Sequence, residues 1–157
     1  MNLISVQSDL CTGCQSCEIV CSLAHEGSCN PSFSRIQIKK WEEISVFVPI
    51  ICQHCENPPC ITTCPTRART RVCETGAVVT DEKRCVGCKS CLYACPYNAP
   101  VIHPITKRTM TCDLCNGQPL CTQVCTTRAL SSTLDGNLSM EKRRAFGQMI
   151  LHSMKLR

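Results

Sequence analysis

Alternation of apolar and polar residues is clearest in residues 35–50, RIQIKKWEEISVFVPI. Ile36 and Ile38, and then Val46 and Val48, stand at every second position. A period of two is typical of strands that bury one face, and a polar stretch separates the two runs. We therefore predict a β-hairpin of two short strands, which occupies residues 31–50.

A second, shorter apolar run lies in ETGAVVTDEKRC, residues 74–85. Gly76 indicates a turn, residues 77–80 a short strand, and the polar residues that follow indicate another turn.

Helical periodicity appears only near the end of the chain. Residues 131–139, SSTLDGNLS, are typical of a loop, and MEKRRAFGQMILHSMKLR then has the pattern of a helix with Ser139 as N-cap. Its apolar face would carry Phe146, Met149, Ile150 and Met154. We predict a C-terminal loop and helix over residues 131–157. The helix either packs on its own domain or docks a partner.

Composition leaves little material for an ordinary hydrophobic core. The 43% of hydrophobic residues include 18 cysteines, and the chain has one Trp, two Tyr and three Phe. A chain of 157 residues with so few large apolar side chains needs another source of cohesion, and the cysteines are the candidates.

The cysteines are expected to bind metal. The start of the chain, MNLISVQSDLC, lacks the pattern of a secretory signal, which favours a reducing, cytoplasmic compartment over one that forms disulfides. No apolar run is long enough for a membrane span.

Sixteen of the cysteines form four quartets that share one pattern. Each begins with C-x2-C and ends with C-x3-C, and only the gap between these halves varies. The first and third have the spacing C-x2-C-x2-C-x3-C. In chain order the quartets are Cys11, Cys14, Cys17 and Cys21; Cys52, Cys55, Cys60 and Cys64; Cys85, Cys88, Cys91 and Cys95; and Cys112, Cys115, Cys121 and Cys125. Cys29 and Cys73 are left over.

Iron–sulfur clusters suit these quartets better than zinc or disulfides. A zinc site uses two separated C-x2-C pairs, whereas here three cysteines fall within seven residues. That run, and the proline that follows Cys95, is the bacterial ferredoxin pattern for a [4Fe–4S] cluster. Sixteen ligands predict four [4Fe–4S] clusters.

The clusters change the charge of the protein. The formal net charge is +5, but each oxidised cluster with its four thiolates carries about −2, which brings the loaded chain to about −3. The lysines and arginines then balance a polyanionic interior, and we expect no binding of nucleic acid.

The fourth cysteine of this motif binds the neighbouring cluster, so the quartets must work in pairs. Cys64 and Cys95 are both followed by proline, whereas Cys21 and Cys125 are not. This pairs the second quartet with the third and the first with the fourth. The predicted ligand sets are Cys11, Cys14, Cys17 and Cys125; Cys21, Cys112, Cys115 and Cys121; Cys52, Cys55, Cys60 and Cys95; and Cys64, Cys85, Cys88 and Cys91.

The predicted fold class is therefore α+β, small and loop-rich. Two nested units that resemble bacterial ferredoxins are followed by the C-terminal helix. The outer unit takes residues 1–30 and 101–130, the hairpin is an insertion at 31–50, and the inner unit takes residues 51–100.

At this point the chain resembles the four-cluster iron–sulfur subunits of the dimethyl-sulfoxide-reductase type. The matching motifs are CTGCQSCEIVC, CQHCENPPC followed by CP, CVGCKSCLYACPY and CDLCNGQPLC, and the resemblance covers about residues 3–130. It implies nested pairing and an electron-transfer role beside a catalytic molybdenum- or tungsten-pterin subunit. The chain departs from the family at Arg67, where glycine is common, and at Cys73. In its compactness, the chain is most similar to the small subunit of tungsten-dependent aldehyde oxidoreductases.

The expected function is a relay that passes electrons between that catalytic subunit and a second partner, such as a flavin subunit or a ferredoxin. Alternatives are a subunit of a hydrogenase or formate dehydrogenase complex, and a maturation protein that stores clusters. End-to-end self-association is a further hypothesis. No catalytic constellation, GxGxxG or P-loop is present, so we expect no enzyme activity in the chain itself.

Some residues near the quartets allow two interpretations. His54 is either structural or a hydrogen-bond donor to a cluster. Arg67, Arg69 and Arg71 alternate after CPT, either as a solvated face or as a docking patch for an acidic redox partner. Cys29 and Cys73 are ordinary thiols or lie at a subunit contact.

Overall fold

The computed structural model describes residues 2–134, which form a small α+β fold with short elements joined by loops. The strands are β1 (Asn2–Val6), β2 (Gln37–Trp41), β3 (Val46–Ile50), β4 (Arg69–Arg71), β5 (Val78–Thr80), β6 (Val101–Ile102), β7 (Thr109–Met110) and β8 (Leu130–Leu134). The α-helices are α1 (Ser16–Glu26), α2 (Pro59–Thr62), α3 (Ser90–Ala94) and α4 (Leu120–Gln123). Four 3-10 helices are η1 (Ser8–Leu10), η2 (Pro31–Phe33), η3 (Glu42–Ile44) and η4 (Leu114–Gly117).

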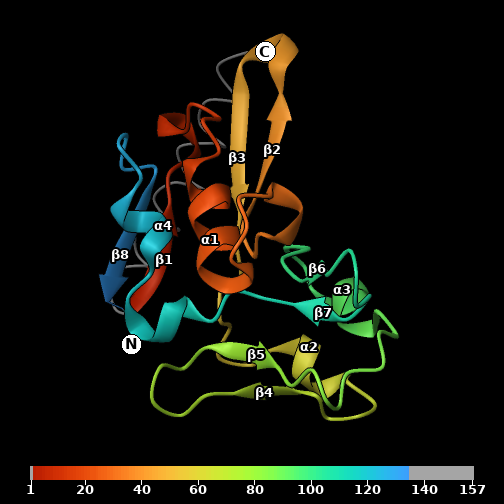
Figure 1. The fold of residues 1–157 in the computed structure, drawn as a ribbon. Helices are drawn as coiled ribbons and strands as arrows, with labels where there is room; N and C mark the ends of the chain where they lie inside the picture. Colours follow the sequence, from red (N-terminus) through yellow and green to blue (C-terminus); the bar gives the residue numbers. More distant parts are fainter. Residues whose placement is uncertain (1, 135–157) are drawn as a thin grey trace, which may run out of the picture.

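The strands of this described region pair as four antiparallel ribbons: β1 with β8, β2 with β3, β4 with β5, and β6 with β7. The β1–β8 ribbon joins the two ends of the described chain, with Ile4 opposite Ser132. Figure 1 shows this ribbon and the β4–β5 ribbon at different sides of the molecule, with the helices between them. Along the chain, β1 precedes the first quartet and β8 follows the last.

The predicted hairpin is confirmed. Strands β2 and β3 pair with Ile38 opposite Pro49, and they project from the body of the molecule in Figure 1. Ile38 is buried near the base, whereas Trp41 and Ile44 are exposed at the tip. The buried carboxylate of Glu18 anchors the base, because its Oε1 accepts a hydrogen bond of 2.9 Å from the Ile38 N–H.

The strand predicted at residues 77–80 is confirmed as β5, and its partner is β4, which the sequence did not predict. Arg69 pairs with Thr80 in this ribbon. A three-residue strand of Arg-Thr-Arg gives no hydrophobic signal, so its pairing could not be inferred from periodicity.

The four helices carry the third cysteine of each quartet and meet in two pairs. Helix α1 packs on α4, which joins the first quartet to the fourth, and α2 packs on α3, which joins the second to the third. Helix α1 begins after Gln15 and ends at Gly27, both in the left-handed conformation, and the Gly27 N–H caps the Leu23 carbonyl.

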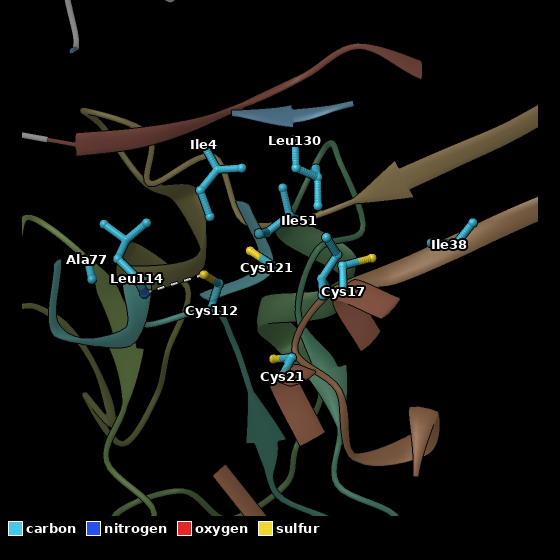
Figure 2. Close-up of a cluster of buried hydrophobic side chains, with 11 residues drawn as sticks. Ile4, Cys17, Cys21, Ile38, Ile51, Ala77, Cys112, Leu114, Cys121 and Leu130 are labelled. Atoms are coloured by element: carbon cyan, nitrogen blue, oxygen red, sulfur yellow. Dashed lines mark hydrogen bonds between the residues drawn. The ribbon is translucent and has the colours of Figure 1, made fainter. Parts of the chain in front are cut away.

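Buried apolar residues form two clusters, and cysteines take a large part in both. The larger includes Ile4, Ile36, Ile51, Leu114 and Leu130 together with cysteines of the first and fourth quartets. Figure 2 shows Ile4 and Leu130, from the paired β1 and β8, next to Ile51 and Cys121 of the same cluster. The smaller consists of Cys60, Val78 and Cys91. The structure therefore confirms, for the described region, that the core has few large apolar side chains and that cysteines make up much of it.

The predicted helix of residues 139–157 lies outside the described residues. Within residues 2–134, no helix has the length and apolar character that a membrane crossing requires.

Candidate metal centres

Four cavities bring the cysteines of the quartets together, and each is lined by four of them. We call them cavities A to D. Their cysteines are Cys11, Cys14, Cys17 and Cys125 in A; Cys21, Cys112, Cys115 and Cys121 in B; Cys52, Cys55, Cys60 and Cys95 in C; and Cys64, Cys85, Cys88 and Cys91 in D. Their empty space is similar, at about 310, 310, 340 and 290 Å³, part of it open to solvent. The groups of cysteines are the same as the four predicted ligand sets.

Each cavity takes three cysteines from one quartet and the last cysteine from another. The exchange is reciprocal between the first and fourth quartets and between the second and third. In the first quartet helix geometry explains it, because residues i and i+4 lie about 6 Å apart along a helix axis. Cys17 of α1 lines cavity A, and Cys21, one turn later, lines cavity B.

The four C-x2-C loops share a positive φ at one position, although the residues at that position differ. The residue before the second cysteine has a positive φ in every quartet: Gly13 at 70°, His54 at 46°, Gly87 at 68° and Leu114 at 62°. Glycine reaches this conformation without strain, whereas histidine and leucine do so at a cost. The shared turn indicates that all four loops fold around the same kind of centre.

A second repeated turn follows the last cysteine in three quartets. The N–H groups of Arg67, Asn98 and Arg128 each donate to the carbonyl of the cysteine three residues earlier, at 3.1–3.2 Å. All three residues have positive φ, and each precedes a buried alanine. The chain therefore leaves cavities A, C and D by the same turn. After the first quartet the longer α1 continues instead.

Several polar groups point at cysteine sulfurs. The N–H groups of Arg35, Leu114 and Leu130 donate to Cys21, Cys112 and Cys125 at 3.3–3.4 Å. Hydroxyl groups also lie near sulfur, with Ser90 3.4 Å from Cys88 and Thr109 3.5 Å from Cys91. N–H and O–H donors to sulfur stabilise a negatively charged sulfur and are typical of iron–sulfur sites, whereas the Thr109 hydroxyl accepts from the Cys91 thiol.

Burial acts against thiolates in the middle of the molecule. It raises the pKa of Cys52 to about 11 and that of Cys121 to about 12, and it raises the pKa of Cys112 well above its usual value. For Cys17, burial and then the Glu18 carboxylate raise the pKa to about 12. Thiols of this kind ionise when a metal binds them, since coordination supplies the positive charge that the protein interior lacks.

The exposed cysteines behave differently. Cys14 of cavity A and Cys88 of cavity D are exposed, and hydrogen bonds from Ser16 and Ser90 lower their pKa values. Within cavities B and C, every cysteine is buried or half-buried. Cavities A and D are thus the two that bring a cysteine to the surface.

An ionic network lies against cavity B. Asp113 accepts from Arg35 at 2.7 Å and contacts His25 Nε2 at 3.1 Å, and its Oδ1 also accepts from the Cys115 N–H at 2.9 Å. Although burial alone would raise the pKa of Asp113, these partners hold it below its usual range. The network fixes the start of the fourth quartet to α1 and to the segment before β2.

His54 has one structural contact and one nitrogen without a protein partner. Its ring is buried, and Nδ1 accepts a 3.0 Å hydrogen bond from the Val78 N–H. Burial, and then the nearby Arg71, lower its pKa to about 4, so the ring is neutral. Nε2 therefore carries the proton, and it is buried without a hydrogen-bond partner among the described residues. The structural interpretation is confirmed for Nδ1, and Nε2 is free to donate to a bound group.

The three arginines after the second quartet differ in their surroundings, which corrects the interpretation of one solvated or docking face. Arg67 is exposed, but Arg69 is only 2% exposed. Arg71 is half-buried and donates to the carbonyls of Gly76, at 2.7 Å, and of Cys55. Strand alternation turns positions 69 and 71 inward, so only Arg67 could meet a partner.

Neither leftover cysteine joins a cavity. Cys29 and Cys73 are exposed and line none of cavities A to D. They are surface thiols of the chain, in agreement with one of the two interpretations.

The residues present fit [4Fe–4S] clusters. Each cavity offers four sulfur ligands and no histidine or carboxylate ligand beside them, apart from the His25–Asp113 pair at cavity B. Buried N–H groups of Arg69 and His54 lack partners among the described residues, as expected where a bound group supplies the acceptors.

Comparisons with known proteins agree with this chemistry. Residues 44–134 match the model of the 4Fe–4S dicluster domain. The polyferredoxin-like subunit of the aliphatic sulfonate oxidoreductase of Pyrococcus furiosus is 40% identical over 122 residues, which are 78% of this chain and 70% of that protein. The electron transfer subunit PhsB of thiosulfate reductase of Salmonella typhi is 38% identical over 133 residues, or 76% of this chain and 69% of that one.

A solved structure is also similar. It is a chain of the active site complex BamBC of benzoyl coenzyme A reductase, with a TM-score of 0.51 and 26% identity over 85% of this chain and 75% of that chain.

Proposed function

Because the chain belongs to the 4Fe–4S dicluster domain family, we propose that it is an electron-transfer subunit that holds four [4Fe–4S] clusters, one in each of cavities A to D. The family model names two clusters over residues 44–134, and the first quartet lies before that segment. The observation that carries the number four is that each cavity is lined by four cysteines.

The cavities follow one another in the order A, B, C, D. Cavities A and B are both lined by residues of α1. Cavity C is lined by residues of α2 and cavity D by residues of α3, and these two helices pack together. Cavities B and C adjoin at the start of the second quartet, because Ile51 lines B and Cys52 lines C. The charge of Cys52 also acts on Cys112 of cavity B. This order supports a linear path.

The exposure of the cysteines supports the same path. Cys14 and Cys88 reach the surface at the two ends, and the cysteines of B and C are shielded. When bound, the clusters accept and pass on one electron at a time. The protein holds the sulfur ligands in place, keeps water from the middle of the path and leaves one contact open at each end. The chain makes and breaks no substrate bonds, as the names of its relatives also indicate.

The same pairing supports two nested units as an interpretation of the fold. The outer unit would combine the first and fourth quartets, closed by the β1–β8 ribbon, and the inner unit the second and third, with the β4–β5 ribbon between them. The β2–β3 hairpin is the insertion that leads from the outer unit to the inner one.

The partners follow from the relatives and from the resemblance of the motifs. We propose that a catalytic subunit of an oxidoreductase contacts one end of the path and a second redox protein, such as a flavin subunit or a ferredoxin, contacts the other. The relatives belong to a sulfonate oxidoreductase and a thiosulfate reductase, and the similar structure to a benzoyl coenzyme A reductase complex. For this chain a molybdenum- or tungsten-pterin subunit, with an aldehyde as substrate, remains the proposal.

Metal analysis of the protein purified without oxygen tests the number of clusters. We expect about 16 iron and 16 sulfide per chain, and an EPR spectrum of interacting clusters after reduction. About eight iron would reduce the proposal to the two clusters of the family model. Two to four zinc ions without visible absorbance would refute it.

Purification with the native partners tests the assignment as a subunit. We expect a larger protein that contains pterin and molybdenum or tungsten to co-purify at a fixed ratio. A loaded chain that stays free of any catalytic subunit would favour the storage alternative.

A further inference from the structure

Arg69 is a buried cation between two of the cavities. It lines both cavity C and cavity D, and only 2% of its surface is exposed. Its Nη1 donates to Thr80 Oγ1 at 2.9 Å, but Nε and Nη2 are buried without a hydrogen-bond partner among the described residues. A buried arginine with two unused donors is costly unless an anion compensates it.

No carboxylate in the described part of the chain supplies that compensation. The ion pairs there join Asp113 to Arg35 and His25, Asp81 to Arg84, and Glu26 to His103. Arg35, which lines cavity B, contacts the Asp113 carboxylate at 2.7 Å, whereas these ion pairs leave Arg69 without a carboxylate partner. The groups that the cysteines of cavities C and D would hold are negatively charged, and Arg69 lines both cavities.

The repeats within the chain differ at the position of Arg69. It stands five residues after Cys64, in CPTRAR. The matching positions are Leu130, in CTTRAL after Cys125, and Pro100, in CPYNAP after Cys95. Leu130 is buried against cavity A and Pro100 against cavity C. The same turn thus accepts an apolar residue at this position, and one repeat carries a charge there instead.

We propose that Arg69 is an internal counter-cation that raises the reduction potentials of the clusters in cavities C and D. This inference rests on the proposed function. Each one-electron reduction adds one negative charge to a cluster, and the electron comes from the redox partner or, in a titration, from dithionite. A fixed positive charge in a poorly solvated position favours the reduced form. The two unused N–H groups would strengthen this effect by donating to sulfur.

The two halves of the molecule balance their charges differently. At cavity B the single carboxylate of Asp113 contacts both Arg35 and His25. Between cavities C and D the bound groups themselves would compensate Arg69.

The test compares two variants that differ in charge but not much in size, Arg69→Gln and Arg69→Lys. Both lose the guanidinium, and only Arg69→Gln loses the charge. Arg67→Leu is the control, because it removes an exposed cation two residues away. Iron content is measured first, and then the midpoints of all clusters by EPR-monitored titration without oxygen.

We expect about 16 iron in each protein. Two of the four midpoints should fall in Arg69→Gln, with at least a tenfold smaller ratio of reduced to oxidised cluster at a fixed potential, or about 59 mV. In Arg69→Lys most of the midpoints should stay at their wild-type values. In Arg67→Leu the ratio of reduced to oxidised cluster at a fixed potential should change less than threefold.

Equal midpoints in Arg69→Gln and Arg69→Lys would overturn the proposal. Loss of the inner iron in both variants, with the remaining midpoints unmoved, would also overturn it, because Arg69 would then be a structural residue. Neither result would affect the proposed function, which fails only if the wild-type protein lacks the iron.

Discussion

Replacing Gly87 by alanine should open cavity D selectively. Gly87 has φ +68°, and a Cβ built there would lie 2.9 Å from the carbonyl oxygen of Lys107. That carbonyl belongs to a tight turn, in which the Lys107 N–H donates to His103 at 3.0 Å, so it cannot recede easily. The substitution therefore adds a backbone clash to the cost of a left-handed alanine.

Gly27 separates these two costs. It has nearly the same φ, +66°, but nothing lies within 4 Å of the position that a Cβ would take there. Gly27→Ala should cost about 1–2 kcal/mol for the left-handed backbone alone. Gly87→Ala should add about 1–3 kcal/mol for the forced contact. A difference of 1.4 kcal/mol is a factor of ten in an equilibrium constant. The population of the locally opened state should therefore be roughly 5–150 times larger in Gly87→Ala than in Gly27→Ala.

The assay is loss of visible absorbance when an iron chelator is added without oxygen. If reclosing is faster than iron capture, the rate follows the population of the open state. If the chain holds the four clusters that we propose, Gly87→Ala should show a fast phase with about a quarter of the total amplitude, because only the cluster of cavity D is affected. Equal rates in the two variants, or a fast phase that removes all the iron, would refute the reasoning.

Three further results are expected. Cys88→Ala should convert one cluster to [3Fe–4S], detected by EPR of the oxidised protein. A Cys64/Cys88 double variant, which removes two ligands of one cluster, should lose about four iron, whereas a Cys64/Cys95 double variant, which removes one ligand from each of two clusters, should lose about two. Equal losses in the two double variants would contradict the crossed ligand sets. Asp113→Ala should destabilise the protein by about 3 kcal/mol, because it leaves buried donors unpaired, while Arg84→Ala, which breaks only an exposed ion pair of 3.5 Å, should cost less than about 0.5 kcal/mol. Thermal loss of visible absorbance compares these two variants, and similar midpoints would show that the Asp113 network has no special weight. Removal of all iron should abolish protection from amide hydrogen exchange, because cysteines make up much of both core clusters, and a protected apoprotein would show that the apolar residues suffice.

Sequence reasoning reached the cysteine groups because covalent spacing limits them. A C-x2-C loop holds its ends together wherever the chain runs, and C-x3-C spans one helical turn, so the exchange of the last cysteine is a local property. The prolines after Cys64 and Cys95 were enough to choose among the pairings. The hairpin of residues 31–50 and the strand at 77–80 were also predictable, because their alternation is local.

The elements that were missed depend on distant parts of the chain. The β1–β8 ribbon pairs residues near both ends of the described region, and neither strand is long enough to give a distinct pattern. The burial of Arg69 was missed for a related reason. An Arg-Thr-Arg segment is typical of a surface, and only the pairing with β5 and the cavities on either side turn Arg69 inward. The internal comparison with Leu130 was available in the sequence and could have given the signal.

The reciprocal exchange of cysteines also determines the order in which the cavities can be completed during translation. Cavities C and D draw their cysteines from residues 52–95, whereas A and B need residues from both ends of the segment 11–125. The first quartet is made first but must wait for roughly 100 further residues, or about 5–20 s at the usual rate of translation. During that interval its thiols are exposed to oxidation and to the wrong metal. The protein would therefore be completed from the inside outward, and its earliest cysteines would be the last to be safely enclosed.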